Sequence, residues 1–271
     1  MHDKVITFVG AGNMAQAIIS AMLNADLRLA RPKKIICNDI MQEKLDAIKD
    51  KYGIYVSADK SEAVSEADII FLAVKPQNIA QTLEEIKPFI KKGALVISIA
   101  AGITTKFIEE SLGGEIAVVR AMPNTPIAVG LGATALCSGK FADTEDLQSA
   151  KFIFGAMGIS RLMSEDKIDA VTALSGSGPA YVFYLCELMQ NAGEELGLDK
   201  MNARDFAVQT VFGAGKMLAE AGADAAVLRQ NVTSPNGTTQ AALKYFKSQN
   251  LSDIVLKAME QAAQRSKELS K

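Results

Sequence analysis

A short strand-like run that ends in a glycine-rich turn constrains this chain more than any other feature. Residues 5–9, VITFV, are mostly apolar and β-branched, and Gly10-Ala11-Gly12-Asn13-Met14-Ala15 follows them directly, before a helical pattern. This order of strand, turn and helix is the context in which G-x-G-x-x-G/A indicates a dinucleotide site. Gly10 permits the tight turn, Gly12 admits a pyrophosphate close to the backbone, and the first N–H groups of the helix face the anion. A glycine-rich turn that binds nothing is the alternative.

Composition excludes several classes of protein. The chain has 271 residues, 49% hydrophobic and 22% charged, which is typical of a globular protein with a sizeable core in one or two domains. A formal net charge of −2 gives no electrostatic reason to expect nucleic acid or an anionic membrane as a partner. No apolar run approaches the roughly 20 residues that span a bilayer, and no secretory signal is visible.

Cysteine and histidine usage narrows the chemistry. Cys37, Cys137 and Cys186 are widely spaced in apolar surroundings, so we expect them in the core of a protein from a reducing compartment. The single histidine, His2, stands beside the N-terminus. An internal histidine acid–base group is therefore excluded, and no metal site of the His/Cys type is expected. We expect a cytoplasmic protein.

Strand-like runs alternate with helical patterns through the first half of the chain. This alternation predicts a parallel sheet covered on both faces, a Rossmann-type doubly wound α/β fold, with ligands bound at the carboxyl ends of the strands. An edge strand is expected at 130–136. The remaining strand-like runs are 35–37, 69–74, 95–99 and 116–119, and the helical patterns are 41–52, 79–90 and 106–112.

Asn38 and Asp39 end the second predicted strand. An acid at this place often accepts hydrogen bonds from the ribose hydroxyls of NAD and repels the 2′-phosphate of NADP. Lys60, at the head of a later segment, would offset that charge. A helix N-cap is the other interpretation of Asp39. Preference between NAD and NADP is left open.

Two further strand ends carry candidate residues. Ala73, Val74 and Lys75 precede Pro76, which suits the first position of a helix. Lys75 lies beside the cofactor phosphates or ribose, or is a solvated loop lysine. Ala100 is small enough to admit a flat nicotinamide ring. The stretch 120–126, with two prolines, predicts a rigid non-helical loop that is either a pocket wall or a plain connection.

The second half of the chain is predicted to be helical. Apolar residues recur at helical spacing over 180–196, 203–220 and 251–269. About 100 residues make a small core for such helices, so pairing with a second copy is expected. The predicted domains are a dinucleotide-binding Rossmann domain, 1–163, and an all-helical substrate-binding and dimerisation domain, 164–271.

Two loops in this half have the composition of a ligand site. The stretch 173–180 breaks the helical pattern with two glycines, and Pro179 is expected to restart the helix at its first position. Ser177, within it, binds substrate or caps that helix. The stretch 231–239 gathers hydroxyls and N–H donors before a helix from Gln240. It is a cradle for a carboxylate or an N-cap rich in hydroxyls.

Taken together, these motifs resemble the pyrroline-5-carboxylate reductases. The resemblance implies reduction of 1-pyrroline-5-carboxylate to L-proline with NAD(P)H, the last step of proline biosynthesis, and intertwined homodimers that often assemble into a decamer. It covers essentially the whole chain: GAGNMA at 10–15, AVKPQ at 73–77, RAMPNTP at 120–126, ALSGSGPAY at 173–181 and VTSPNGTT at 232–239.

The resemblance also assigns site residues. The residue patterns described above already make Asn38, Asp39 and Lys60 candidate cofactor-binding residues, and Ser177 a candidate substrate-binding residue. Three positions depart from the family pattern: Lys60 stands where Asn is frequent, many members lack an acid at Asp39, and Asn236 replaces a frequent Gly, a mild change if its backbone is left-handed. By resemblance the cofactor residues are Gly10, Ala11, Gly12, Asn13, Met14, Ala73, Val74, Lys75, Ala100 and Asn231, and the substrate residues are Ser234, Gly237, Thr238 and Thr239.

The implied chemistry agrees with the lack of an internal histidine. A protonated imine is already electrophilic, so the protein needs mainly to align the reactants and hold the carboxylate. Thr239 is the candidate catalytic residue, as hydrogen-bond partner of the imine nitrogen and proton relay. One alternative is another imine or hydroxyacid reductase in which Lys75 donates a proton to a carbonyl. Another is a non-catalytic nucleotide-binding regulator, which leaves the hydroxyl-rich loop unexplained.

Overall fold

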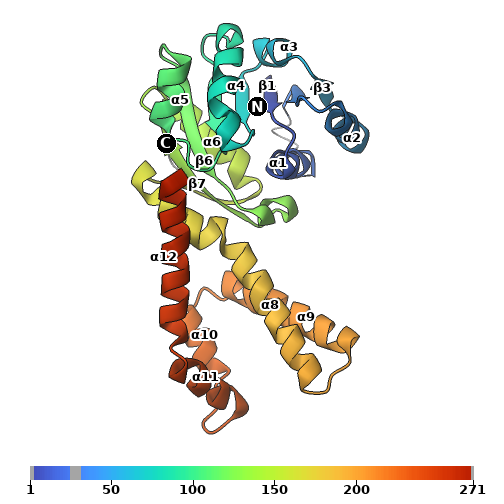
Figure 1. Ribbon diagram of the computed structural model, residues 1–271, viewed down its shortest axis with the longest axis vertical. Coiled ribbons are helices and arrows are strands. Elements are labelled where there is room, and N and C mark those ends of the chain that lie inside the picture. The colour runs from blue at the N-terminus through green and yellow to red at the C-terminus, as the bar shows by residue number, and fades with distance from the viewer. Residues whose placement is uncertain (1–2, 25–31, 270–271) are drawn as a thin grey trace. The chain divides into compact units, whose positions relative to one another are not determined.

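The computed structural model describes residues 3–24 and 32–269, so His2 lies outside the described residues. The chain divides into two compact units (Figure 1). The first runs up to Gly176 and takes in the end of the chain from Ala262, and the second is Ser177–Gln261. The domain boundary expected between residues 163 and 164 stays a prediction.

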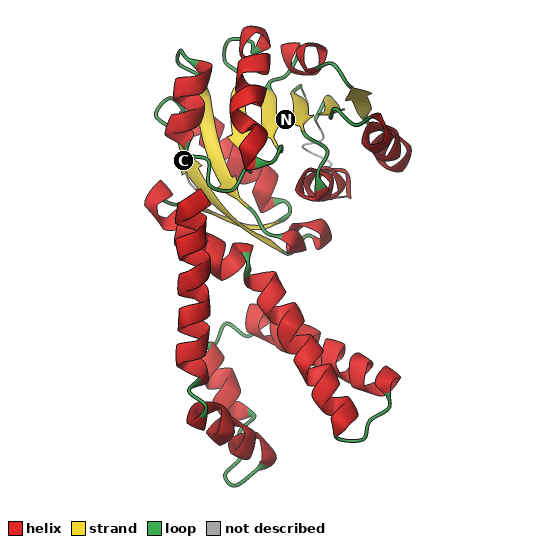
Figure 2. Ribbon diagram, in the orientation of Figure 1, coloured by secondary structure: helices red, strands yellow, loops and turns green. Residues whose placement is uncertain are grey.

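The first unit is built on an eight-stranded sheet with the order β3-β2-β1-β4-β5-β6-β7-β8 within the described residues (Figure 2). All pairings from β3 through β6 are parallel, β6 and β7 are antiparallel, and β7 and β8 are parallel. The strand order reverses between β1 and β4, which is the topological switch point where doubly wound sheets bind ligands. The strands are β1 (Val5–Val9), β2 (Lys34–Asn38), β3 (Tyr55–Ser57), β4 (Ile69–Leu72), β5 (Leu95–Ser98), β6 (Ala117–Met122), β7 (Gly132–Ser138) and β8 (Gly158–Leu162).

Helices cover both faces of this sheet, which confirms the predicted Rossmann-type fold. Along β4, Phe71 faces a cluster that includes Phe8 and Phe154, whereas Ile70 and Leu72 face a second cluster. The rings of Phe8 and Phe71 stack with centroids 4.5 Å apart. A strand buried on both faces needs a continuous apolar run, as this sequence has. The helices are α1 (Asn13–Asn24), α2 (Gln42–Tyr52), α3 (Lys60–Ser65), α4 (Ile79–Ile86), α5 (Thr105–Leu112), α6 (Thr144–Gly155) and α7 (Ile168–Val171).

Two expectations about the end of the sheet are wrong. β6 continues to Met122, so Arg120, Ala121 and Met122 belong to a strand and not to a rigid loop, and a 3₁₀-helix (Thr125–Val129) follows. β7 is not the edge, because β8 pairs along its outer side. β8 escapes sequence reasoning because Ile159 and Leu162 are exposed, and it therefore lacks the apolar run of a fully buried strand.

The second unit is helical, as predicted. Its helices are α8 (Gly178–Glu195), α9 (Lys200–Glu220), α10 (Ala225–Asn231), α11 (Thr238–Ser248) and the first part of α12 (Leu251–Leu269). α8 packs against α9. The short α10 was not predicted, and α11 begins two residues before the expected Gln240.

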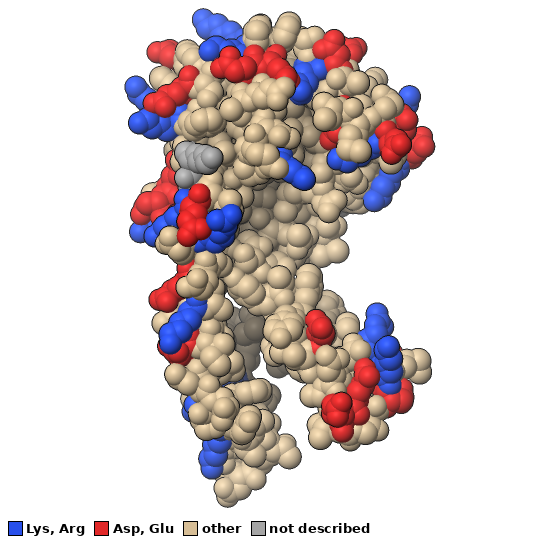
Figure 3. All heavy atoms as spheres, in the orientation of Figure 1, with Lys and Arg blue, Asp and Glu red and all other residues tan. Residues whose placement is uncertain are grey.

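The second unit carries many exposed apolar side chains. Phe183 is 66% exposed, Phe206 64% and Phe212 59%, while Ala203 and Ala207 are the apolar side chains buried among the described residues of this unit. On the face drawn in Figure 3, charged side chains are sparse over much of this unit and gather near the turn between α8 and α9. Such an apolar surface indicates that another protein surface covers it.

The segment expected to break the helical pattern is helical except at Ser177, where one helix ends and the next has its N-cap. α7 passes into a π-helix (Thr172–Gly176), and α8 begins at Gly178, so Pro179 is its second residue and not its first. The hydroxyls of Thr172 and Ser175 donate to the carbonyls of Ile168 and Val171, four residues earlier. These bonds keep the hydroxyls of Thr172 and Ser175 satisfied within the helical segment that ends at Gly176.

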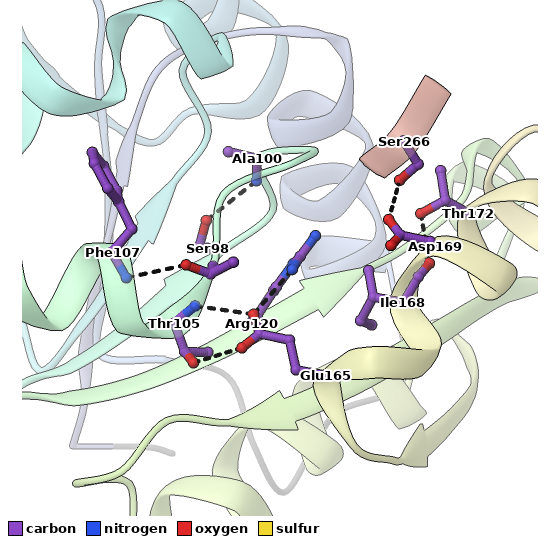
Figure 4. Close-up of polar contacts among 11 residues, drawn as sticks. Ser98, Ala100, Thr105, Phe107, Arg120, Glu165, Ile168, Asp169, Thr172 and Ser266 are labelled. Atoms are coloured by element: carbon purple, nitrogen blue, oxygen red, sulfur yellow. Dashed lines mark hydrogen bonds and ion pairs between the residues drawn. The ribbon is translucent and has the colours of Figure 1, made fainter. Parts of the chain in front are cut away.

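A polar network anchors the chain after β8 to the sheet (Figure 4). Glu165 Oε1 accepts from Thr105 N and from Arg120 Nη1, both at 3.0 Å, and Glu165 Oε2 accepts from Thr105 Oγ1 at 2.9 Å. Ser266 Oγ, near the end of α12, donates to Asp169 Oδ1 at 2.7 Å. Glu165 thus connects the first turn of α5 and the strand β6 to the segment that leads into α7.

The cysteines follow the expectation in part. Cys37 and Cys137 are buried, and burial is the main cause that raises the pKa of Cys37 to about 12 and that of Cys137 to about 11. Cys186, on α8, is partly exposed, so its predicted place in the core is wrong for the single chain. No helix of residues 3–24 and 32–269 is both long and apolar enough to cross a bilayer.

Candidate active site

A cleft of about 540 Å³ lies at the carboxyl ends of β1, β2 and β4. It lies at the switch point of the sheet, where the strand order predicts a ligand. The structure brings together nine of the predicted cofactor residues in its lining, all from the first unit: Gly10, Ala11, Gly12, Asn38, Asp39, Lys60, Ala73, Val74 and Lys75.

The glycine turn shapes one wall of this cleft. Gly10 has φ +109°, and a Cβ at this position would lie 2.6 Å from the carbonyl oxygen of Ala73, so only glycine allows the ends of β1 and β4 to approach this closely. Above Gly12 the space is open, because a Cβ there would meet nothing nearer than the same oxygen at 3.9 Å. α1 begins at the next residue, and the N–H groups of a first helical turn have no intrahelical partner. The turn therefore fits the pyrophosphate of a dinucleotide.

Asp39 is held rigidly beside the turn. Its Oδ2 accepts a hydrogen bond from the Ala11 N–H at 2.9 Å, and its Oδ1 accepts from the Met41 N–H at 3.0 Å. Lys44 Nζ lies 3.9 Å from Oδ2. The N-cap of α2 is Met41, without a side-chain cap, so the interpretation of Asp39 as a helix N-cap is wrong. Asp39 instead closes a local turn and faces the cleft.

Lys60 is committed to an ion pair. It is the first residue of α3, and its Nζ contacts Glu85 Oε2 on α4. Glu85 Oε1 accepts from Gln81 Nε2 at 2.7 Å. The hydrogen bond from Lys60, and then the one from Gln81, lowers the pKa of Glu85. The charge of Lys60 is therefore largely offset by Glu85.

Lys75 and Asn38 complete the polar lining. Lys75 is exposed, precedes the 3₁₀-helix Pro76–Asn78, and has no carboxylate within ion-pair distance in the described part of the chain. Asn38 donates from Nδ2 to the Ser57 carbonyl at 2.9 Å, while its buried Oδ1 has no hydrogen-bond partner among the described residues. A buried, unpartnered acceptor in a cleft lining indicates a place for a donor from a ligand or water.

Sequence reasoning missed several residues of the lining. They follow strand ends that were already singled out, and the four that come after Pro76 repeat at helical spacing, a signal that could have found them. The missed residues are Ile40, Met41, Lys44, Gln77, Asn78, Gln81 and Thr82.

Three of the predicted cofactor residues of the first unit are not brought to this cleft. Asn13 and Met14 begin α1 and lie next to the glycine turn without lining the cleft. Ala100 is only 5% exposed and packs in an apolar cluster with Ile103 and Val118. Among the described residues, no group of three or more His, Cys, Asp or Glu side chains could hold a metal ion.

The hydroxyl-rich loop of the second unit does not cap its helix. The N-cap of α11 is Gly237, with no side-chain cap, and no hydroxyl of Ser234, Thr238 or Thr239 bonds to a described residue. The N-cap interpretation of this loop is therefore wrong. The hydroxyls of Ser234, Thr238 and Thr239 are therefore uncommitted within the described residues, which a carboxylate ligand requires.

Two backbone features keep this loop tight. Asn236 has φ +59°, the left-handed conformation in which Asn replaces Gly at small cost, and its N–H donates to Gln240 Oε1 at 2.9 Å. A side chain at Gly237 would collide with Ser234 Oγ. Asn231 is the exposed last residue of α10, and Ser177 is the N-cap of α8 but makes no cap with its hydroxyl.

The fold and the cleft define a dinucleotide-binding α/β protein with a separate helical unit. A family model described as pyrroline-5-carboxylate reductase dimerisation matches residues 165–269, and one described as NADP oxidoreductase coenzyme F420-dependent matches residues 5–102. The pyrroline-5-carboxylate reductase 1 of Bacillus spizizenii is 42% identical to this chain, over 99% of the chain and 90% of the relative.

Solved structures of pyrroline-5-carboxylate reductases are similar to this chain along its whole length. A pyrroline-5-carboxylate reductase from Coxiella burnetii is 42% identical, covers 99% of both chains and has a TM-score of 0.90. The Plasmodium falciparum pyrroline carboxylate reductase with NADP bound is 30% identical over 100% of both chains, with a TM-score of 0.88. The chain belongs to the pyrroline-5-carboxylate reductase family, which confirms the resemblance. The dimerisation match over the helical residues accounts for their exposed apolar surface, so the protein is a homo-oligomer.

Proposed function

We infer that this chain is an NAD(P)H-dependent oxidoreductase that reduces 1-pyrroline-5-carboxylate to L-proline, the last step of proline biosynthesis. Family membership over the whole chain supports the reaction. The observation that carries the site is the head of α11, where three hydroxyls and the first N–H groups are all uncommitted in the described part of the chain.

The head of α11 is the proposed substrate site. The N-terminus of a helix attracts an anion through its free N–H groups and its dipole, and the substrate carries a carboxylate. Ser234, Gly237 and Thr238 supply a hydroxyl, an accessible backbone and a second hydroxyl for that carboxylate. Ser177 adds a further hydroxyl. Because α11 has 11 residues, its dipole is fully developed at this end.

Thr239 is the proposed catalytic residue. It is the second residue of α11, next to the carboxylate donors, and its hydroxyl hydrogen-bonds the imine nitrogen and relays a proton. The reduced nicotinamide, when bound, supplies the hydride. The chain has no internal histidine to act as an acid, and a protonated imine does not require one. The residues around Thr239 then work mainly by holding the substrate in one orientation.

The cofactor site is the cleft of the first unit. The glycine turn with Asn13 and Met14 holds the pyrophosphate, Lys75 stabilises its charge, and Ala73, Val74 and Ala100 border the path to the nicotinamide ring. Asn231 contributes from the helical unit. We also propose the domain limits 1–163 and 164–271, assembly of homodimers into a decamer, and a cytoplasmic location.

A spectrophotometric assay tests this function. Oxidation of NADH and NADPH is followed at one enzyme concentration with 1-pyrroline-5-carboxylate and with a panel of 2-keto acids. Turnover with the cyclic imine and little with the keto acids is expected. Turnover with keto acids only would favour a hydroxyacid reductase with Lys75 as proton donor, and cofactor binding without turnover of any substrate would favour a regulator.

A further inference from the structure

We propose that this chain binds NADH in preference to NADPH, and that Asp39 and Glu85 determine this preference. The inference rests on the proposed function, because it concerns the cofactor of the same site. Nucleotide specificity in doubly wound folds depends on the charge at the end of the second strand, where the adenine ribose lies. The charged groups at that end of the cleft are therefore decisive.

The carboxylate of Asp39 cannot turn away from the cleft. It follows β2, lines the cleft and is only 11% exposed, and each of its oxygens accepts a backbone N–H, from Ala11 and from Met41. Each carboxylate oxygen retains a further lone pair for a ribose hydroxyl. The 2′-phosphate of NADPH carries a charge of about −1.5 to −2 at neutral pH and would face this fixed negative group.

The cations at the same end are offset. Lys44 Nζ lies 3.9 Å from Asp39 itself, and Lys60 is paired with Glu85, which Gln81 also holds in place. The two carboxylates balance the two ammonium groups, so a 2′-phosphate finds no excess of positive charge there. Sites for NADP normally present a cation to this phosphate.

Among the lysines of the described cleft lining, Lys75 is the one without a carboxylate partner, and it lies at the end of β4 and not of β2. Lys75 follows β4, two residues after Ala73, whose carbonyl oxygen borders the glycine turn. This position suits the pyrophosphate, which NADH and NADPH share. Lys75 therefore adds to the affinity for both cofactors and does not select between them.

Binding measurements test the preference without turnover. Dissociation constants for NADH and NADPH are obtained from nicotinamide fluorescence in the absence of substrate, and those for 5′-AMP and adenosine 2′,5′-bisphosphate from calorimetry. The wild-type chain is expected to bind NADH about tenfold more tightly than NADPH, or better, and the bisphosphate more weakly than 5′-AMP.

Two variants and a control assign the residues. Glu85→Gln releases Lys60 and should tighten NADPH binding about threefold to tenfold, with NADH binding unchanged. Glu84→Gln makes the same charge change on the same helix but has none of the contacts of Glu85, and should leave the ratio of the two constants as it is. Asp39→Asn keeps the shape and one acceptor oxygen and should reduce the ratio, with folding checked by circular dichroism.

Three results would overturn the inference: equal or tighter binding of NADPH by the wild-type chain, equal effects of the Glu84 and Glu85 variants, or an Asp39→Asn variant that weakens both cofactors by the same factor. The proposed function has its own outcome. Tighter binding of NADPH, together with faster turnover of 1-pyrroline-5-carboxylate with NADPH, would support the proposed reaction but reject the NADH preference. Selective binding of NADH without turnover would support the preference but reject the proposed reaction.

Discussion

Arg120 and Glu165 form an ion pair with 3.0 Å between Nη1 and Oε1, although 45 residues separate them in the chain. The Arg120 side chain is 3% exposed, and its Nε and Nη2 have no partner among the described residues. Glu165 also accepts hydrogen bonds from the backbone N–H and the hydroxyl of Thr105 at the start of α5. One carboxylate thus compensates a buried charge and connects three separate segments.

Removal of this carboxylate should destabilise the first unit. Glu165→Ala leaves a buried guanidinium unpaired, which is expected to lower the free energy of unfolding by about 3 kcal/mol. Urea denaturation at fixed protomer concentration measures it. Glu110→Ala, which removes an exposed pair with Lys106, is the control and should change stability little. Equal effects of both substitutions would show that the Arg120 pair contributes no special stability.

Alanine substitutions at the two glycines of the turn should have different effects, one on stability and the other on cofactor binding. Gly10→Ala places a Cβ 2.6 Å from the Ala73 carbonyl oxygen at a positive φ, so it should lower the melting temperature. Gly12→Ala meets nothing closer than 3.9 Å in the protein, so the fold should persist while cofactor affinity falls more than tenfold, by about 1.4 kcal/mol or more. Thermal unfolding and cofactor titration measure both. A Gly12→Ala variant with normal affinity would contradict the proposed pyrophosphate site.

Substitutions at the head of α11 should affect different kinetic constants. Thr239→Val removes the proposed proton relay and should lower kcat about 100-fold with little change in cofactor affinity. Ser234→Ala removes a carboxylate contact that is present in both ground and transition states, and should mainly raise KM. Steady-state kinetics with 1-pyrroline-5-carboxylate measure the split. Unchanged turnover in Thr239→Val would reject its role.

The exposed apolar side chains of the helical unit should hold the homo-oligomer together. Phe183→Asp combined with Phe212→Asp places charges on this surface and is expected to shift the protein to a smaller species by light scattering. Phe89→Asp is a matched control, since Phe89 is 43% exposed but lies outside the dimerisation match. An unchanged mass for the double variant, with helix content preserved, would place the interface elsewhere.

Asp68 should make stability depend on pH in the acid range. Its carboxylate accepts the Val5 N–H and pairs with Lys91, each at 2.6 Å. Burial acts to raise the pKa of Asp68, but the hydrogen bonds from Lys91 and Val5 outweigh it and hold the pKa below its ordinary value. Because the folded pKa is the lower one, the stabilisation is present above the unfolded value of about 3.9 and is lost as pH falls through the folded value.

Urea denaturation at several pH values checks this dependence. Asp68→Asn should be less stable than the wild type at neutral pH, and its stability should fall less steeply below about pH 4. Asp50→Asn, on the exposed end of α2, should follow the wild-type curve. Parallel acid limbs for the Asp68 variant and the wild type would rule out the linkage.

Local patterns predicted a large part of this molecule. The glycine turn and the apolar runs of β1, β2, β4 and β5 identified the doubly wound sheet, because a strand buried on both faces must be apolar throughout. Helical spacing located α8, α9 and α12 to within a few residues. Residues at strand ends could be grouped into one site, since parallel strands bring their carboxyl ends to the same edge.

Other features depend on contacts between distant segments. β8 became visible only through its pairing with β7. The pairing of Lys60 with Glu85, the anchoring of Asp39 by Ala11 and the missing cap on α11 likewise have no sequence signature.

The sequence by itself therefore determined the architecture and the family, because backbone conformation, apolar periodicity and glycine positions are local properties of the chain. Tertiary structure alone decided which charged and hydroxyl groups are committed to other residues and which stay available to a ligand. The physical reason is that hydrogen bonds and ion pairs form between side chains that folding brings within a few ångströms, whatever their separation along the chain.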